Sequence, residues 1–205
     1  MAVITNIIPP QADELIRDQV GKILRDEITS QMMMYNTDAI IYGVWADRVM
    51  PFDENELPAI NVSTPKGDYD NWHQGSKDGV FTLFIDVHTQ SPADGKTTGG
   101  DVLANFAMKR LLGVCQYILS DPQYKTLGFA PGAFIQWVRV IGYDVRPHYV
   151  DENGRASAAL NTAMGRLVIT VKANQTNTLI TPVPLQSSIT TVQLNSTSKG
   201  YLYSD

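Results

Sequence analysis

The sequence has little of what catalytic, metal-binding and secreted proteins depend on. Cys115 is its only cysteine, so no disulfide can form within the chain. It falls inside an apolar helical pattern, which predicts a small buried residue and not a reactive thiol. The three histidines, His73, His88 and His148, are widely dispersed. No phosphate-binding, dinucleotide, nucleophile-elbow or zinc-protease motif is present.

Asp86 and His88 are the one acid–histidine pair with a useful spacing. On a strand they would share a face, where acid–base or metal chemistry is conceivable. No third residue is spaced to complete such a site, so the pattern favours an exposed polar strand face. We therefore expect no catalytic, metal-ligating or cofactor-binding residue.

Charge is scarce as well. Charged residues make up 18% of the chain, below the roughly 25% typical of soluble domains, and this favours a surface partly buried against neighbours. The net charge is -5, and Lys109-Arg110 is the nearest approach to a basic cluster. Tight nucleic-acid binding is disfavoured, whereas an acidic surface that DNA slides past is compatible. The start of the chain lacks signal-peptide features and no apolar run approaches a membrane span, which predicts a cytoplasmic protein.

Two segments have the periodicity of amphipathic helices. The first follows Pro9-Pro10 and is broken at Asn36-Thr37-Asp38. The second begins with Asp101 as its predicted N-cap and ends at Asp121-Pro122. Its predicted buried stripe consists of Leu103, Phe106, Ala107, Arg110, Leu111, Val114, Ile118 and Leu119.

Five segments are rich in β-branched and aromatic residues or alternate in polarity, which predicts strands. They are Ala39–Trp45, Leu57–Val62, Val80–His88, Phe134–Asp144 and Leu160–Ala173. Pro58 cannot donate to a sheet ladder, so its strand should start there or lie at an edge. The predicted fold is α+β, in the order α-β-β-β-α-β-β: a mainly antiparallel sheet covered on one face by two helices.

The predicted loops and the tail supply candidate interface residues. We expect Pro65–Gly79 to be a long exposed loop, in which Tyr69 and Trp72 either anchor an interface or fold back onto the core. Asn153-Gly154 is the favoured type I′ turn, so the segment around it forms either a hairpin arm or a loose loop.

The chain divides into a folded domain over residues 1–174 and a polar arm over residues 175–205. The arm is too polar to form a core of its own. It carries regularly spaced apolar residues, including Leu185, Ile189 and Tyr201. The arm either adds to the sheet edge of a neighbour or is disordered.

Four segments together resemble the tail terminator proteins of tailed bacteriophages, of the lambda minor tail protein U type. They are Glu56–Val62, Phe81–Val87, Ile141–Asp144 and Gly165–Val171, and their order and spacing carry the likeness. In that family a strand start with proline and alanine is followed by an apolar strand with an acid, a helix, a Gly-Tyr-Asp strand end and a closing strand. The likeness covers about Ala12 to Lys172.

The resemblance implies a virion protein assembled in the host cytoplasm. It would form a homohexameric ring on the end of the tail tube, end tube polymerisation and present the surface that joins the head. The implied partners are copies of itself, the tail tube protein, a head connector or completion protein and, in a contractile tail, the sheath. DNA would pass through the lumen without specific binding, and no membrane is involved.

Three alternative functions remain open. Another neck component, such as a head completion or connector adaptor protein, would share the structural character. A small cytoplasmic enzyme without a recognisable motif would need a pocket that encloses His88 and Asp86 with a bound ion. A stable monomer would instead favour a ligand-binding module that uses Trp72.

Overall fold

The computed structural model describes residues 10–35, 43–73, 76–91, 99–130, 134–146, 162–174, 190–193 and 200–203. Its main elements are α1 (Ala12–Tyr35), β1 (Gly43–Ala46), β2 (Ala59–His73), β3 (Ser76–Gln90), α2 (Gly100–Ser120), β4 (Ile135–Arg146) and β5 (Thr162–Asn174). Two short 3-10 helices, η1 (Glu54–Glu56) and η2 (Pro122–Tyr124), and two short strands, β6 (Thr190–Gln193) and β7 (Gly200–Tyr203), complete the described part. The expected α+β fold and its element order are confirmed.

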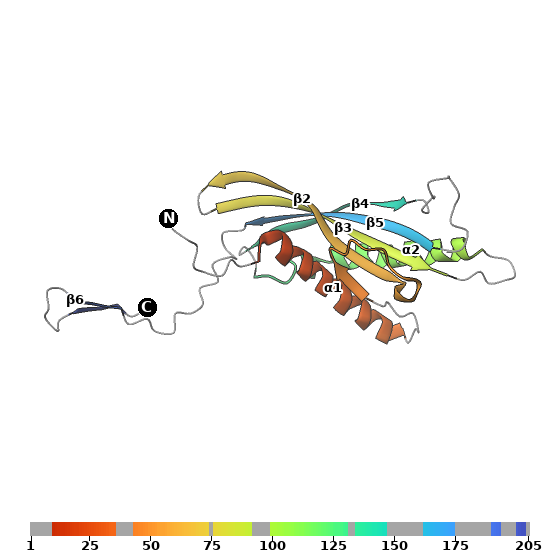
Figure 1. Cartoon of the computed structure of the whole chain (residues 1–205), viewed down its shortest axis with the longest axis horizontal. Coiled ribbons are helices and arrows are strands. Elements are labelled where there is room, and N and C mark those ends of the chain that lie inside the picture. The colour runs from red at the N-terminus through yellow and green to blue at the C-terminus, as the bar shows by residue number, and fades with distance from the viewer. Residues whose placement is uncertain are drawn as a thin grey trace.

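The five-stranded sheet has the order β1-β2-β3-β5-β4. β1 runs parallel to β2, and the other three pairs are antiparallel. Both helices lie beneath the same face of the curved sheet (Figure 1). We call the opposite face the open face. The molecule is therefore built of two layers, as the sequence predicts for a sheet with one apolar face.

The core follows from alternation along β3 and β5. The side chains of β5 alternate strictly between buried and half-buried positions, and register pairs Ile85 with Leu167 and Leu83 with Ile169. All four are fully buried beside both helices. Cys115 belongs to the same cluster, so the prediction of a buried cysteine is confirmed, and burial raises the pKa of its thiol to about 12.

The predicted buried stripe of α2 is right for Ile118 and Leu119 and wrong for Phe106, Ala107 and Arg110, which are exposed. The buried positions are Gly100, Ala104, Met108, Leu112, Cys115, Ile118 and Leu119, whereas Phe106 is 67% exposed. Apolar residues occupy most of the circumference of α2, so helical spacing alone allows several stripes. The sheet selects the one that fits, because Gly165 leaves room for Met108 and Leu112 above it.

The start of α2 also differs from the prediction. Gly99 is the N-cap, without a side-chain hydrogen bond, and Asp101 lies in the first turn, so it is not the cap. With 21 residues, α2 has the length and composition of a membrane span, contrary to the expectation that no segment approaches one. Its buried stripe packs against the sheet, as the core helix of a globular domain does.

The prediction that Pro65–Gly79 is a loop is wrong, although residues 65–69 are exposed as expected. β2 and β3 form a long antiparallel ladder that pairs Tyr69 with Gly79, and bulges near Pro65 and Asp70 absorb the irregular residues. A Cβ on Gly67 would lie 3.0 Å from the Phe81 ring, so this glycine makes room for an aromatic side chain and does not break the strand. β2 begins at Ala59, directly after Pro58, and is an inner strand.

Two bulges change the pattern of β4, near Gln136 and Ile141. A simple period of two along Phe134–Asp144 would place Ile135, Trp137, Ile141 and Tyr143 on one face. Each bulge inserts a residue and reverses the alternation beyond it. Trp137 therefore lies opposite Lys172 on the open face, and Ile141 is the inserted residue of the second bulge. Tyr143 returns to the face of Ile135, opposite Leu167, but it is 63% exposed, whereas Ile135 is buried.

The described part of the arm consists of β6 and β7. They pair with each other, Val192 opposite Tyr201, and form a two-stranded sheet of their own. Within the described residues, neither is a strand of the five-stranded sheet.

Candidate interaction surfaces

A broad groove runs between the C-terminal half of α1 and the outward face of α2. Its volume is about 1080 Å³. The apolar side chains that line it include Ile28, Phe106, Leu111, Val114 and Tyr117. Phe106 and Tyr117 are 67% and 78% exposed, which is unusual for two large aromatic side chains on the same side of one helix, about three turns apart. We call this surface the helix groove.

Charged groups surround the apolar floor of the helix groove. Glu27 and Asp121 lie among its lining residues, as do Lys109 and Arg110. The hydroxyl of Tyr124 donates a hydrogen bond to Glu27 and ties η2 to α1. Burial, followed by this carboxylate, raises the pKa of Tyr124 to about 12. An apolar centre within a polar rim is the composition of a protein-binding surface.

The β2–β3 ladder presents a second aromatic feature. Tyr69 is 43% exposed and packs edge-on against Phe81, with ring centroids 5.8 Å apart. A Cβ on Gly79 would lie 3.1 Å from the Tyr69 ring, so the glycine opposite Tyr69 allows this close packing. One side of Tyr69 therefore contacts the core residue Phe81 and the rest faces outward. The backbone of Trp72 pairs with Lys77, and its side chain lies outside the described residues.

On the open face, Arg166 joins β5 to β3. Its guanidinium donates two hydrogen bonds to the carboxylate of Asp86, at 2.6 and 2.7 Å, and lies 4.0 Å from the centre of the Phe84 ring. Asp86 is only 5% exposed. The expectation of an exposed polar strand face is thus wrong for Asp86, because its ion-pair partner comes from the neighbouring strand.

His88 is also engaged. Its ring lies against Phe52 in a tilted arrangement, with centroids 4.9 Å apart, and the guanidinium of Arg48 lies 4.4 Å from the centre of the Phe52 ring. Burial lowers the pKa of His88, Asp86 acts in the opposite direction, and the charge of Arg166 lowers it further. Asp86 is paired with Arg166 and His88 packs against Phe52, so the two side chains have different partners. No cluster of three potential metal ligands occurs among the described residues.

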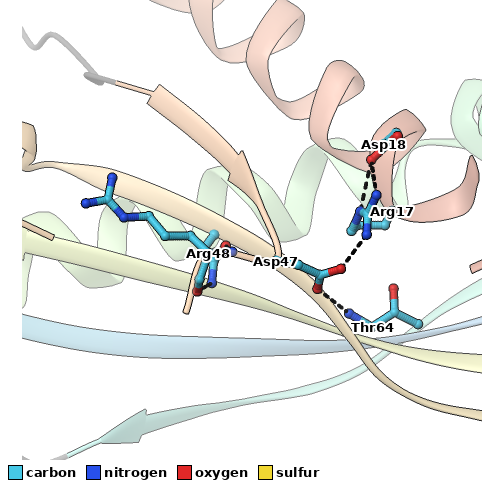
Figure 2. Close-up of polar contacts among 6 residues, drawn as sticks. Arg17, Asp18, Asp47, Arg48 and Thr64 are labelled. Carbon is cyan, nitrogen blue, oxygen red and sulfur yellow. Dashed lines mark hydrogen bonds and ion pairs between the residues drawn. The ribbon is translucent and has the colours of Figure 1, made fainter. Parts of the chain in front are cut away.

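A polar joint connects α1 to the end of β1 (Figure 2). Arg17 pairs with Asp18 and with Asp47, and the other carboxylate oxygen of Asp47 accepts the Thr64 N–H at 3.3 Å. The N–H of Asp47 donates to the Val62 carbonyl at 2.9 Å. These contacts hold Asp47 in the left-handed region, at φ 47°. Arg48, next in the chain, instead pairs with Glu56.

Several predicted interface residues cannot be placed. Asn153, Gly154, Leu185 and Ile189 lie outside the described residues, and the side chain of Tyr201 does too. Sequence reasoning missed the exposed aromatic pair Phe106 and Tyr117. The available signal was the apolar circumference of α2, which exceeds what one covered face requires.

Comparison with known proteins adds no relative: no family model and no curated protein matches the chain. Three of the four segments that carry the tail-terminator resemblance lie on β3, β4 and β5, and the first runs from the end of η1 into the start of β2. Two of them are direct neighbours, because Phe81–Val87 pairs with Gly165–Val171 along its whole length.

Proposed function

We propose that this protein is a structural assembly protein that forms a ring on the end of a phage tail tube, stops its growth and offers the head-joining surface. The observation that carries the proposal is the helix groove, with Phe106 and Tyr117 exposed at its edge. Leaving such side chains in water costs free energy, about 25 cal/mol for each Å² of apolar surface that a partner would otherwise cover. A neighbouring subunit is the partner that the ring supplies.

A closed ring with cyclic symmetry requires two different surfaces on each subunit, because head-to-tail contacts join unlike patches. The helix groove supplies one such surface. The Tyr69 side of the β2–β3 ladder supplies the second candidate, since it combines a partly exposed aromatic ring with an extended pair of strands. The sequence resemblance then assigns this geometry to a tail terminator.

The proposal is tested by changing the groove without disturbing the core. Phe106→Asp and Tyr117→Asp place a charge where a neighbour would otherwise cover an aromatic ring, and both positions are exposed in the free subunit. We expect the double variant to fold, to lose ring assembly and to leave tail tubes uncapped. The measurements are mass in solution by light scattering and tube-length distributions by electron microscopy.

Val49→Asp is the matched control, because Val49 is 94% exposed and lies outside the groove lining. It should assemble like the wild type. Rings found on tube ends support the terminator role, whereas rings found only on heads support another neck component. A wild-type protein that stays monomeric and leaves tube lengths unchanged contradicts both.

A further inference from the structure

β4 is a long edge strand. Of the described strands only β5 pairs with it, so its other side carries backbone groups without a strand partner. Natural edge strands are commonly protected by lysine, proline, other charged side chains or bulges. β4 has no lysine or proline over its 12 residues, but it carries two bulges and the exposed charges of Arg139 and Asp144. Ile141, Tyr143 and Val145 are 57%, 63% and 37% exposed along this edge. Such an edge accepts only a strand that matches its charges and its bulge.

The sequence of β4 is complementary to itself when read in the antiparallel direction. In the register that places Arg139 opposite Asp144 of a second copy, Val140 meets Tyr143 and Val138 meets Val145. The two-fold symmetry repeats every contact, so the opposite charges meet twice.

The bulge at Ile141 makes this register geometrically consistent. A symmetric antiparallel pair requires opposed residues to project from the same face. The β5 partners of Arg139 and Asp144 are Thr170 and Arg166, both on the open face. The partners of Val140 and Tyr143 are Ile169 and Leu167, both on the helix face. Without the inserted residue, positions 139 and 144 would project from opposite faces.

The charged groups that this register would join are available. Within the described residues, neither Arg139 nor Asp144 forms an ion pair, although the guanidinium of Arg139 lies 5.5 Å from the centre of the Trp137 ring. Both side chains are exposed. The bulge of one copy would face the bulge of the other at the symmetry axis, so neither disturbs the pairing on its two sides.

We propose that the outer edge of β4 is a self-recognition site that pairs with β4 of a second copy in this register, extending the sheet across a two-fold axis. The contact joins like surfaces and closes as a dimer, unlike the head-to-tail contacts of a ring. It is independent of the ring proposal. Pairing of this kind covers the exposed edge in free subunits and prevents unspecific strand addition.

Charge reversal tests the register. Arg139→Asp and Asp144→Arg each place like charges opposite each other at both symmetric positions. We expect each single variant to dimerise at least about tenfold more weakly than the wild type. An equimolar mixture of the two variants should recover the dimer, because each mixed pair restores both attractions. The double reversal within one chain should recover it as well.

The measurement is sedimentation over a concentration series, in the wild type and in the Phe106→Asp background, where the proposed ring contact is removed. Lys22→Asp, an exposed charge reversal on α1, is the control and should leave dimerisation unchanged. If the Phe106→Asp variant loses six-fold rings but still forms dimers, the ring contact at the helix groove and the β4 contact are separate. Equal association of all variants, failure of the mixture to recover the dimer, or a wild type that is monomeric throughout overturns the β4 proposal.

Discussion

Asp86 and Arg166 show how strongly one residue pair depends on the sheet that brings it together. The side chains are 7% and 17% exposed, so each would be poorly solvated without the other. Removing one partner of such a pair leaves a desolvated charge, whereas replacing both with apolar groups can cost little.

We predict that Asp86→Ala lowers the free energy of unfolding by about 2–3 kcal/mol, less than a fully buried pair because Arg166 keeps some contact with water. The double variant Asp86→Leu with Arg166→Met should lose less than the two single variants together. Urea unfolding measures the free energies of Asp86→Ala, of the single variants Asp86→Leu and Arg166→Met, and of the double variant. Asp68→Ala, which breaks the exposed pair with Lys66, is the control and should cost at most about 0.5 kcal/mol. Equal losses for Asp86→Ala and Asp68→Ala would show that burial of the pair contributes nothing.

Among the elements, α1 is held to the sheet by packing and by the polar joint at Asp47. A non-glycine residue at positive φ is strained by about 1–2 kcal/mol unless local contacts offset the strain. Asp47 combines a carboxylate for Arg17 and the Thr64 N–H with a conformation that aspartate tolerates better than most residues.

We therefore expect Asp47→Ala to destabilise the protein by about 1–2 kcal/mol, because it removes the carboxylate and keeps the strained backbone. Asp47→Gly loses the same contacts but relieves the strain, so it should cost less than the alanine variant. Thermal unfolding compares the two. If glycine proves as costly as alanine, the backbone conformation is not what Asp47 stabilises.

At the scale of the whole molecule, we expect the residues up to the end of β5 to be sufficient for folding, and the arm after β5 to act only in assembly. Within the described part of the chain, every residue of the hydrophobic core lies between Ala12 and Ala173. A chain that ends at Asn174 should therefore unfold at the same temperature as the full chain. We expect it to assemble less well, since the arm is a candidate contact with neighbouring subunits. Circular dichroism reports the first effect, and the yield of rings reports the second. A large loss of stability would place the arm within the fold, and unchanged assembly would show that the arm is not needed for it.

Local patterns predicted the kinds of elements better than their partners. Alternation around Leu83 and Ile169 identified both central strands, because a sheet with one covered face imposes a period of two. Gly67 and Gly79, in contrast, led to a wrong prediction. They indicated a loop, and the structure uses them to make room for Phe81 and Tyr69 within a ladder. A glycine reports small size or conformational freedom, and only its neighbours in space distinguish the two.

By itself, the sequence determined the α+β class, the element order and the burial of Cys115, since each depends on periodicities within one segment. The tertiary structure decided the partner of Asp86, the stripe of α2 that is buried, and the faces of β4 beyond its bulges. These depend on the register between strands far apart in the chain. A single inserted residue turns the following side chains of β4 to the other face, and a small rotation of α2 decides whether Phe106 is buried or exposed. Only the packing of the helices against the sheet selects between these alternatives.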